Sequence, residues 1–434
     1  MKSLKVGICG LGTVASGVIN VIKRNQHEIS ARAGCQVDVV HVGSRSLKNN
    51  CDMTGIAFTT NLMDVIDNPE VDVVAELIGG YDLAKEIVCS AIRNGKHVVT
   101  ANKALIAEHG NEIFALAAEH NVIVAYEAGV AGGIPIIKAL REGLAGNKIN
   151  WLAGIINGTG NFILTEMKDK GRDFADVLEE AQALGYAEAD PTFDVEGIDA
   201  AHKLAILASV AFGVPLQFEK TFTEGISKIS TLDVNNAEEL GYRIKHLGIA
   251  RRQKNGFELR VHPTLIPEHQ LIAKVDGVMN SVLVDGDAVG QTLYYGAGAG
   301  SEATASAVIA DLVDVARVVN SKSEEFVPYL GFSAEKLQAL PVIPIEEIIS
   351  AYYLRVTAED HPGVLAEVAS ILSDLGINIE SVMQKESEQE NNTIPLVLLT
   401  HEVQEKQINL AIEKIEALGT TIGNVVRIRV EHFN

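Results

Sequence analysis

The sequence predicts an α/β protein made of three units with different architectures. Residues 1–130 alternate short β-branched runs with segments that suit helices, which is typical of a doubly wound parallel sheet covered on both faces. Residues 131–300 contain several alternating strands without helices between them, and this favours a mixed sheet in an α+β unit. Residues 351–434 read strand, helix, strand, strand, helix, strand.

Composition and charge restrict the classes of function. The chain has 434 residues, 47% hydrophobic and 21% charged, so a sizeable core is available. A net charge of −21 argues against nucleic acid and anionic membranes as partners, because both attract clustered positive charge. We find no signal peptide and no apolar run long enough to span a membrane. Four scattered cysteines without metal-binding spacing indicate a reduced, cytoplasmic protein.

The first strand leads into a glycine-rich turn, "GICGLGTVASGV", with Gly10, Gly12 and Ala15 in G-x-G-x-x-A spacing. The first glycine permits a tight turn, the second lets the backbone approach a pyrophosphate, and the third position must be small for helix and strand to pack. The N-terminus of the following helix attracts phosphate. In an alternating α/β segment this pattern predicts a Rossmann-type dinucleotide-binding fold.

The second strand ends in "VVHVGSR", where an NAD enzyme usually carries an acid. Ser44 and Arg45 instead offer a donor and a cation suited to a 2′-phosphate. NADP preference is therefore a hypothesis, with NAD still possible. A solvent-facing arginine without a ligand is the alternative.

Two further segments carry candidate ligand-binding groups. Lys103 in "VVTANKALIAEHG" follows a predicted parallel strand, at the sheet edge where ligands bind, although an ordinary surface lysine fits equally well. Glu127 in "YEAGVAGGIPI" precedes a glycine-rich turn whose free carbonyls could hold a cation. On the residues alone a domain hinge is favoured there.

The segment "YAEADPTFDVEGIDAAHK" crowds acidic side chains before a helix that is apolar on every side through Phe212. Asp199 and Lys203 lie four residues apart at its entrance, on one helical face. Burial there would move their pKa values toward a catalytic range. The alternative is a solvated acidic loop with an exposed ion pair.

The rest of the chain suggests how the units are joined. Residues 301–320 predict a long amphipathic helix that packs back on the first unit, and residues 331–350, with two prolines and little periodicity, suit a linker. Residues 351–434 predict a ferredoxin-like βαββαβ unit, with the polar stretch "ESEQENN" at 386–392 as a hairpin connection.

Several motifs together resemble those of bacterial homoserine dehydrogenases with a C-terminal ACT regulatory domain, over essentially the whole chain. They are "GLGTVASGV", "TANKALIA", "YEAGVAGGIPI", "NGTGNFIL", "YAEADPTFDVEGIDAAHKL", "GAGAGSEATASAV" and, for the ACT domain, "EDHPGVLAEVASILSDLGINIES". The resemblance implies interconversion of L-homoserine and L-aspartate 4-semialdehyde with NAD(P)(H), on the route to threonine, methionine and isoleucine. It implies an NAD(P)-binding domain at 1–130, completed by the helix at 301–320, a catalytic and dimerisation domain at 131–300, and the ACT domain at 351–434.

The resemblance also implies roles for individual residues. The catalytic lysine falls on Lys203 and its partner carboxylate on Asp199. Substrate contacts are expected at Gly185, Glu188, Asp194, Asp199 and Lys103. Cofactor contacts are expected at Gly10, Gly12, Thr13, Val14, Arg45, Thr100, Lys103 and Gly300. The family's sodium site, in which main-chain oxygens supply most of the ligands, corresponds to Glu127, Val130, Gly132 and Ile134. With this resemblance a sodium site is favoured over a domain hinge for the turn.

In this interpretation hydride passes from the hydroxyl-bearing carbon to the nicotinamide, while Lys203 takes the hydroxyl proton. Because a neighbouring anion raises the pKa of a lysine, we expect Asp199 chiefly to orient the amine and contact substrate. Threonine is the expected effector, near Asp360, Pro362–Gly363 and Asn378, in a homodimer or homotetramer. The alternative for the ACT domain is a role in assembly alone. The alternatives for the whole protein are a different NADP-linked dehydrogenase, acting on another amino-acid-derived carbonyl, and a non-catalytic sensor that binds NADP and an amino acid.

Overall fold

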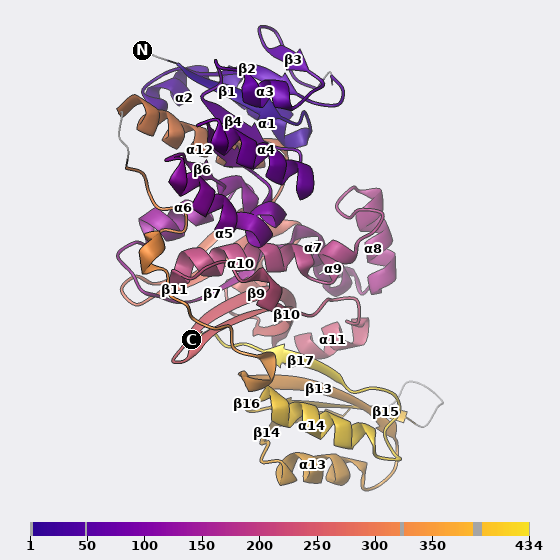
Figure 1. The fold of residues 1–434 in the computed structure, drawn as a ribbon. Coiled ribbons are helices and arrows are strands. Elements are labelled where there is room, and N and C mark those ends of the chain that lie inside the picture. Colours follow the sequence, from indigo (N-terminus) through magenta and orange to yellow (C-terminus); the bar gives the residue numbers. More distant parts are fainter. Residues whose placement is uncertain (1–2, 48–49, 322–324, 385–392, 434) are drawn as a thin grey trace.

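The computed structural model describes residues 3–47, 50–321, 325–384 and 393–433 as three units stacked along one direction (Figure 1). The predicted hairpin connection at 386–392 lies outside these residues. Within the described ranges no helix combines the length and apolar character needed to cross a membrane.

The N-terminal unit is a six-stranded parallel sheet in the order β3-β2-β1-β4-β5-β6. Its strands are β1 (Leu4–Cys9), β2 (Val37–Gly43), β3 (Ala57–Thr59), β4 (Val73–Glu76), β5 (His97–Thr100) and β6 (Val124–Ala125). Its helices are α1 (Thr13–Arg24), α2 (Gln26–Ala33), α3 (Met63–Asp67), α4 (Asp82–Arg93) and α5 (Lys103–Glu119). One apolar core lies on each face of the sheet, so the predicted Rossmann-type arrangement is confirmed.

Helix α12 (Ser301–Ser321) returns to this unit from far along the chain (Figure 1). Its apolar side chains share one core with those of α1 and β1. A Cβ atom added at Gly17 of α1 would lie 2.6 Å from the carbonyl oxygen of Ser301, so the two helices touch through backbone. The contact brings the start of α12 beside the glycine-rich turn.

The middle unit is built on long antiparallel strands, in the order β12-β11-β7-β9-β10. They are β7 (Ile149–Ile155), β9 (Tyr242–Gln253), β10 (Gly256–Pro267), β11 (Met279–Gly286) and β12 (Gly290–Ala297), with the short β8 (Phe222–Thr223) parallel to β10. The helices are α6 (Ile136–Lys138), α7 (Gly158–Lys170), α8 (Phe174–Ala183), α9 (Thr192–Val195), α10 (Ile198–Phe212) and α11 (Thr231–Glu239). The predicted mixed sheet is confirmed.

Helix α10 is the buried apolar helix that the sequence predicts. Its side chains from Leu204 to Phe212 are all buried, between α5 of the first unit and the sheet of the second. Gly197, with φ +85°, precedes its first turn, and Gly213, with φ +65°, ends it in the left-handed conformation that favours glycine. The helix therefore carries Asp199 and Lys203 to the boundary between the two units.

The C-terminal unit has the predicted ferredoxin-like fold, with sheet order β17-β13-β15-β14. It contains β13 (Ile349–Glu359), α13 (Val364–Asp374), β14 (Ile379–Gln384), β15 (Thr393–Thr400), β16 (Val403–Gln404), α14 (Glu405–Glu416) and β17 (Val426–Val430). Both helices share an apolar core with one face of the sheet. The other face contributes to a core shared with α7, α8 and α11.

The two sheets are continuous, which the sequence did not predict. Strand β17 pairs in parallel with β10, with Thr264 opposite Arg429 and Leu265 opposite Val430. Beyond β17, the ring of Phe433 stacks on Trp151 of β7 at 5.1 Å between centroids. The segment from β17 to Phe433 is therefore packed against the middle unit.

Buried ion pairs stabilise the seam, by which we mean the junction of the two sheets at β10 and β17. Arg260 of β10 is fully buried and donates to Glu431 at 2.5 Å and to Glu258 at 2.9 Å. The second oxygen of Glu431 accepts from Arg251 of β9 at 2.7 Å. Removing one partner of a buried network leaves uncompensated charge, which destabilises strongly.

We expect Arg260→Ala to lower the free energy of unfolding by about 3–5 kcal/mol, because the buried Glu258 and Glu431 would lose their buried cation and be left with the partly exposed Arg251. The measurement is the shift of the denaturant midpoint, followed by circular dichroism. Arg32→Ala is the control, since the exposed Arg32 side chain pairs with the exposed Glu28 and its removal should give no measurable shift. Equal midpoints for the two variants would contradict the role of this network.

Candidate active site

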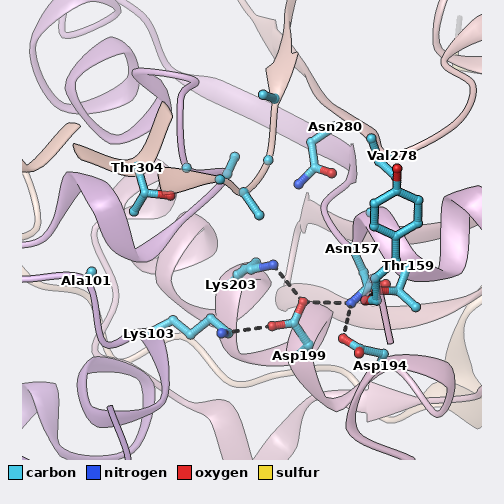
Figure 2. Close-up of a pocket in the computed structure, with 18 of the residues that line it drawn as sticks. Ala101, Lys103, Asn157, Thr159, Asp194, Asp199, Lys203, Val278, Asn280 and Thr304 are labelled. Atoms are coloured by element: carbon cyan, nitrogen blue, oxygen red, sulfur yellow. Dashed lines mark hydrogen bonds and ion pairs between the residues drawn. The ribbon is translucent and has the colours of Figure 1, made fainter. Parts of the chain in front are cut away.

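A cavity of about 610 Å³ lies at the junction of the parallel-sheet unit and the middle unit. It is lined from the first unit by α1, α5 and the turn after β6, and from the second by α7, α10, the segment after α8, and the ends of β11 and β12. Figure 2 shows the side chains of α5, α7 and α10 that converge on it. Nine predicted site residues line it: Val14, Lys103, Gly132, Gly185, Glu188, Asp194, Asp199, Lys203 and Gly300.

The centre of the site is the Asp199 carboxylate, which two lysines share (Figure 2). Its Oδ2 atom accepts from Lys203 Nζ at 2.6 Å, and its Oδ1 atom pairs with Lys103 Nζ at 3.1 Å. Lys203 also donates to the carbonyl of Ile156, the residue after β7, at 2.7 Å. Asp199 is 5% exposed, so the interpretation as an exposed ion pair is wrong.

Burial and charge act in opposite directions on this pair. Burial lowers the pKa of Lys203, and although Asp199 raises it, the net direction is down, with Lys103 adding to the decrease. The pKa of Asp199 is lowered despite burial, because both lysines stabilise its anion. The outcome is a carboxylate that stays ionised next to an amine that gives up its proton more easily than an exposed lysine.

Asn157 holds the acidic groups in place, and sequence reasoning did not single it out. Its Nδ2 donates to Asp199 at 2.9 Å and to Asp194 at 2.8 Å, while its Oδ1 caps α7 by accepting from Gly160 N at 2.7 Å. Burial raises the pKa of Asp194. Asn157 begins the motif "NGTGNFIL", so its position as a helix cap before an apolar segment was the signal available.

The acidic stretch divides into two groups. Glu188, Asp194 and Asp199 line the cavity, with Glu188 exposed at its mouth beside Gly185. Asp190 instead accepts from the backbone of Thr192, and Glu196 accepts from Ser227, so these two stabilise the loop. Only the first group is placed to meet a ligand.

The glycine-rich turn fits a phosphate-bearing ligand. Gly10 has φ +100°, and a Cβ there would lie 2.7 Å from the carbonyl oxygen of Leu77. A Cβ at Gly12 would meet nothing within 4 Å, so open space remains before α1, whose N-terminus has no side-chain cap. Exposed N–H groups at an uncapped helix start suit a pyrophosphate. Thr13 opens this helix and Val14, its second residue, lines the cavity.

Gly10, Gly12 and Thr13 of the glycine-rich turn are not themselves in the cavity lining, and neither are the predicted cofactor residues Thr100 and Arg45. The hydroxyl of Thr100 is buried and donates to Glu76 at 2.6 Å, which in turn accepts from the backbone of Ile78 and Gly79. Arg45 is exposed two residues beyond β2. The last residue of that strand, Gly43, accepts from Gly10 N at 2.8 Å, so Arg45 follows a strand that borders the glycine-rich turn.

The predicted sodium residues surround the turn after β6. Glu127 is buried, its carboxylate accepts from the backbone N–H groups of Ile137 and Lys138 at 2.9 and 2.8 Å, and burial together with Asp311 raises its pKa to about 7. Gly132, with φ +45°, lies beside the buried Val130 and Ile134. Among the described residues no cluster of three His, Cys, Asp or Glu side chains suits a metal, so any cation here would depend on main-chain oxygens.

Comparison with known families agrees with this geometry. The family model described as "Homoserine dehydrogenase" matches residues 135–313, "Homoserine dehydrogenase, NAD binding domain" matches 10–127, and "ACT domain" matches 352–420.

Individual relatives extend this agreement over the full length. The chain is 66% identical to homoserine dehydrogenase of Pseudomonas aeruginosa and 53% identical to that of Neisseria gonorrhoeae, in each case over 100% of both chains. A crystal structure of homoserine dehydrogenase from Thiobacillus denitrificans is 59% identical, with a TM-score of 0.95 over 100% of this chain and 99% of that one. A hyperthermophilic archaeal homoserine dehydrogenase, solved in complex with NADPH, is 26% identical, with a TM-score of 0.62 over 72% of this chain and 98% of that one.

The resemblance found from the motifs is thereby confirmed. With an NAD-binding domain, a homoserine dehydrogenase catalytic domain and an ACT domain along its length, and with relatives that match it over that whole length, the chain belongs to the homoserine dehydrogenase family and is an oxidoreductase.

Proposed function

We propose that the chain interconverts L-homoserine and L-aspartate 4-semialdehyde, with Lys203 as the group that carries the hydroxyl proton. The observation that supports this most strongly is the position of the Lys203 amine, in the wall of a cavity that also reaches the helix after the glycine-rich turn. In the cell this reaction would serve the route to threonine, methionine and isoleucine.

When bound, the nicotinamide supplies the hydride acceptor or donor. In the oxidising direction the neutral Lys203 amine accepts the proton of the substrate hydroxyl, and in the reducing direction its ammonium returns it. The lowered pKa of Lys203 makes both states accessible. Asp199 orients the amine through the hydrogen bond at 2.6 Å, and Lys103 keeps this carboxylate ionised from its other side.

The remaining cavity residues are suited to hold an amino-acid substrate. Glu188 and Asp194 present carboxylates to the cavity, where they would attract an ammonium group, and Asn157 holds the carboxylate of Asp194 in place. Gly185, with φ +75°, gives the segment between α8 and α9 its turn and keeps the wall free of a side chain. We assign these residues to substrate binding.

Lys203→Ala should lower kcat for homoserine oxidation by about 10²-fold or more, because the proton acceptor is lost. Lys203→Arg should be similarly impaired, since a guanidinium does not release its proton near neutral pH. The control is Lys170→Ala, which removes another lysine of an i,i+4 pair, with Glu166, on the exposed side of α7. Near-normal kcat in a folded Lys203→Ala variant would contradict the proposal, and comparison of homoserine with other hydroxy amino acids tests the substrate.

We further propose that NADP is preferred over NAD. Arg45 is an exposed cation beyond β2, and the segment "GSRS" at 43–46 contains no acidic side chain to bind a ribose hydroxyl. The archaeal relative was solved with NADPH, which makes the phosphorylated cofactor a reasonable ligand here.

Arg45→Ala should raise KM for NADP by roughly 10-fold or more and leave KM for NAD nearly unchanged, because only NADP carries the 2′-phosphate. Arg93→Ala, at the exposed end of α4, is the control. Kinetics with a strong NAD preference that Arg45→Ala does not alter would reject this assignment.

A sodium ion is proposed at Glu127, Val130, Gly132 and Ile134. Among the described hydrogen bonds, none ends on the carbonyl oxygens of Val130 or Gly132, so both are available to a cation. The buried carboxylates of Glu127 and Asp311 lie beside the turn, with Lys138 as a nearby cation. Free main-chain oxygens close to buried carboxylates are the kind of ligands that suit a hard cation.

Sodium chloride should raise the melting temperature and kcat relative to choline chloride at equal ionic strength, because the ion binds the folded state. Glu127→Gln should reduce the rise in melting temperature, whereas Glu28→Gln, on the exposed face of α2, should not. Identical melting curves in sodium chloride and choline chloride would contradict the proposal of a sodium site.

Threonine is proposed as an effector that binds the C-terminal unit, in a homodimer or homotetramer. Strand β14 is an edge of the continuous sheet, and Val382 on it and Leu365 on α13 are 44% and 40% exposed. Exposed apolar groups at a sheet edge favour pairing with a second copy. Asp360, Pro362–Gly363 and Asn378 are the residues that we place near the effector.

Saturating threonine should raise KM for homoserine by about 5-fold or more, since allosteric coupling is typically of that size. Asn378→Ala should weaken this effect without changing KM in the absence of threonine. Lys406→Ala, an exposed residue of α14, serves as control. If kinetics at saturating threonine are unchanged and no threonine binds, the proposal of a threonine effector is contradicted. Assembly would then be the role of the C-terminal unit.

A further inference from the structure

We propose that Asn280 hydrogen-bonds the carboxamide of the bound nicotinamide ring and so orients the ring in the cavity. This assignment rests on the proposed function of the cavity and adds a cofactor contact that the motifs do not indicate. Asn280 is the second residue of β11 and lines the cavity (Figure 2).

The Asn280 side-chain amide has no hydrogen-bond partner among the described residues, and its oxygen is buried. The residue is 1% exposed, and its Oδ1 atom is buried with no hydrogen-bond partner. Within the part of the chain that the structure describes, no hydrogen bond is formed by its Nδ2 atom either. A buried amide without a partner destabilises the protein that contains it. A ligand in the cavity would satisfy it.

The neighbours of Asn280 place it on the cofactor side of the cavity. A Cβ added at Gly298 would lie only 2.0 Å from Asn280 Nδ2, so the amide packs directly on the backbone of residues 297–300. These residues lead into α12, and the hydroxyl of Ser301 donates to the carbonyl of Thr13 at 2.8 Å. The same backbone therefore connects Asn280 to the start of α1, where we place the pyrophosphate.

The chemistry of the amide favours a neutral ligand group. Four ionisable groups of the cavity, Lys103, Asp194, Asp199 and Lys203, are joined through Asn157, hydrogen bonds and ion pairs in one network. In Figure 2, Asn280 lies apart from this network. A primary amide offers one acceptor and one donor side by side. The nicotinamide carboxamide offers the complementary pair, whereas homoserine carries charges that the ionised network is better suited to bind.

Asn280→Ala should weaken binding of NADP⁺ by about 5-fold or more, measured by calorimetry on the free protein. The substitution removes the side-chain amide that would hydrogen-bond the nicotinamide carboxamide. Binding of 2′-phospho-ADP-ribose, which lacks the nicotinamide ring, should be unchanged. Binding of the 3-acetylpyridine analogue, in which a methyl group replaces the carboxamide nitrogen, should be weakened less than that of NADP⁺. Equal weakening of all three ligands, or of none, would overturn the assignment.

Ser281→Ala is the matched control. Ser281 is the next residue of β11, is fully buried, and also has a hydroxyl without a partner, but it is not part of the cavity lining. Alternation along the strand directs its side chain to the opposite face of the sheet. Ser281→Ala should therefore bind all three ligands as the unchanged protein does.

A stability measurement separates ligand binding from a structural role. Asn280→Leu keeps most of the volume and removes an amide that has no partner in the protein, so the melting temperature without ligand should stay the same or rise. The increase in melting temperature on adding NADP⁺ should shrink. A lower melting temperature without ligand, together with an unchanged increase, would show a structural role and overturn the proposal.

Failure of this inference is distinct from failure of the proposed function. If the unchanged protein oxidises homoserine and Asn280→Ala binds NADP⁺ equally well, only the role of Asn280 is wrong. Weaker homoserine binding with unchanged NADP⁺ binding would likewise overturn it. If the unchanged protein does not oxidise homoserine, the proposed function itself is wrong.

Discussion

The site depends on one buried carboxylate, that of Asp199, which three elements hold in place. Lys203 comes from the same helix, Lys103 from the first residue of α5 in the parallel-sheet unit, and Asn157 from the N-terminus of α7. An isolated buried carboxylate would be protonated, since burial disfavours its charge. Two ammonium groups and one amide keep it ionised, and its position then fixes where the Lys203 amine can lie. Burial of that amine opposes the attraction of the anion, and the balance favours a lowered pKa.

The C-terminal unit is connected physically to this carboxylate. Arg429 of β17 donates to Glu224 at 2.7 Å, and the carbonyl of Glu224 is hydrogen-bonded to His246 at 3.0 Å. Two residues on, Ile226 N donates to Val195, three residues before α10. The contacts form an unbroken path from the seam of the two sheets to the helix that carries Asp199. A path of contacts transmits an effector signal only if one of its elements has two arrangements.

Much of this structure followed from the sequence, because local patterns encode it. Strand and helix periodicity predicted the architecture of the three units. The positive φ of Gly10 requires a glycine, as the motif indicates. The four-residue spacing of Asp199 and Lys203 placed them on one face of a buried helix. Long-range contacts could not be predicted this way. The pairing of β10 with β17 joins residues about 165 positions apart, and Asn280 reveals its orphaned amide only once β11 is folded beside residues 297–300.

The protonation of Lys203 gives the most direct test of this account. In protein with ¹³C-labelled lysine, the Cε resonance assigned by its loss in Lys203→Arg can be followed against pH without cofactor or substrate. We predict a midpoint below that of the exposed lysines, because burial outweighs the attraction of Asp199, and a rise of that midpoint in Lys103→Met, which removes the neighbouring cation. A midpoint at or above that of the exposed lysines, unmoved by Lys103→Met, would contradict the central claim.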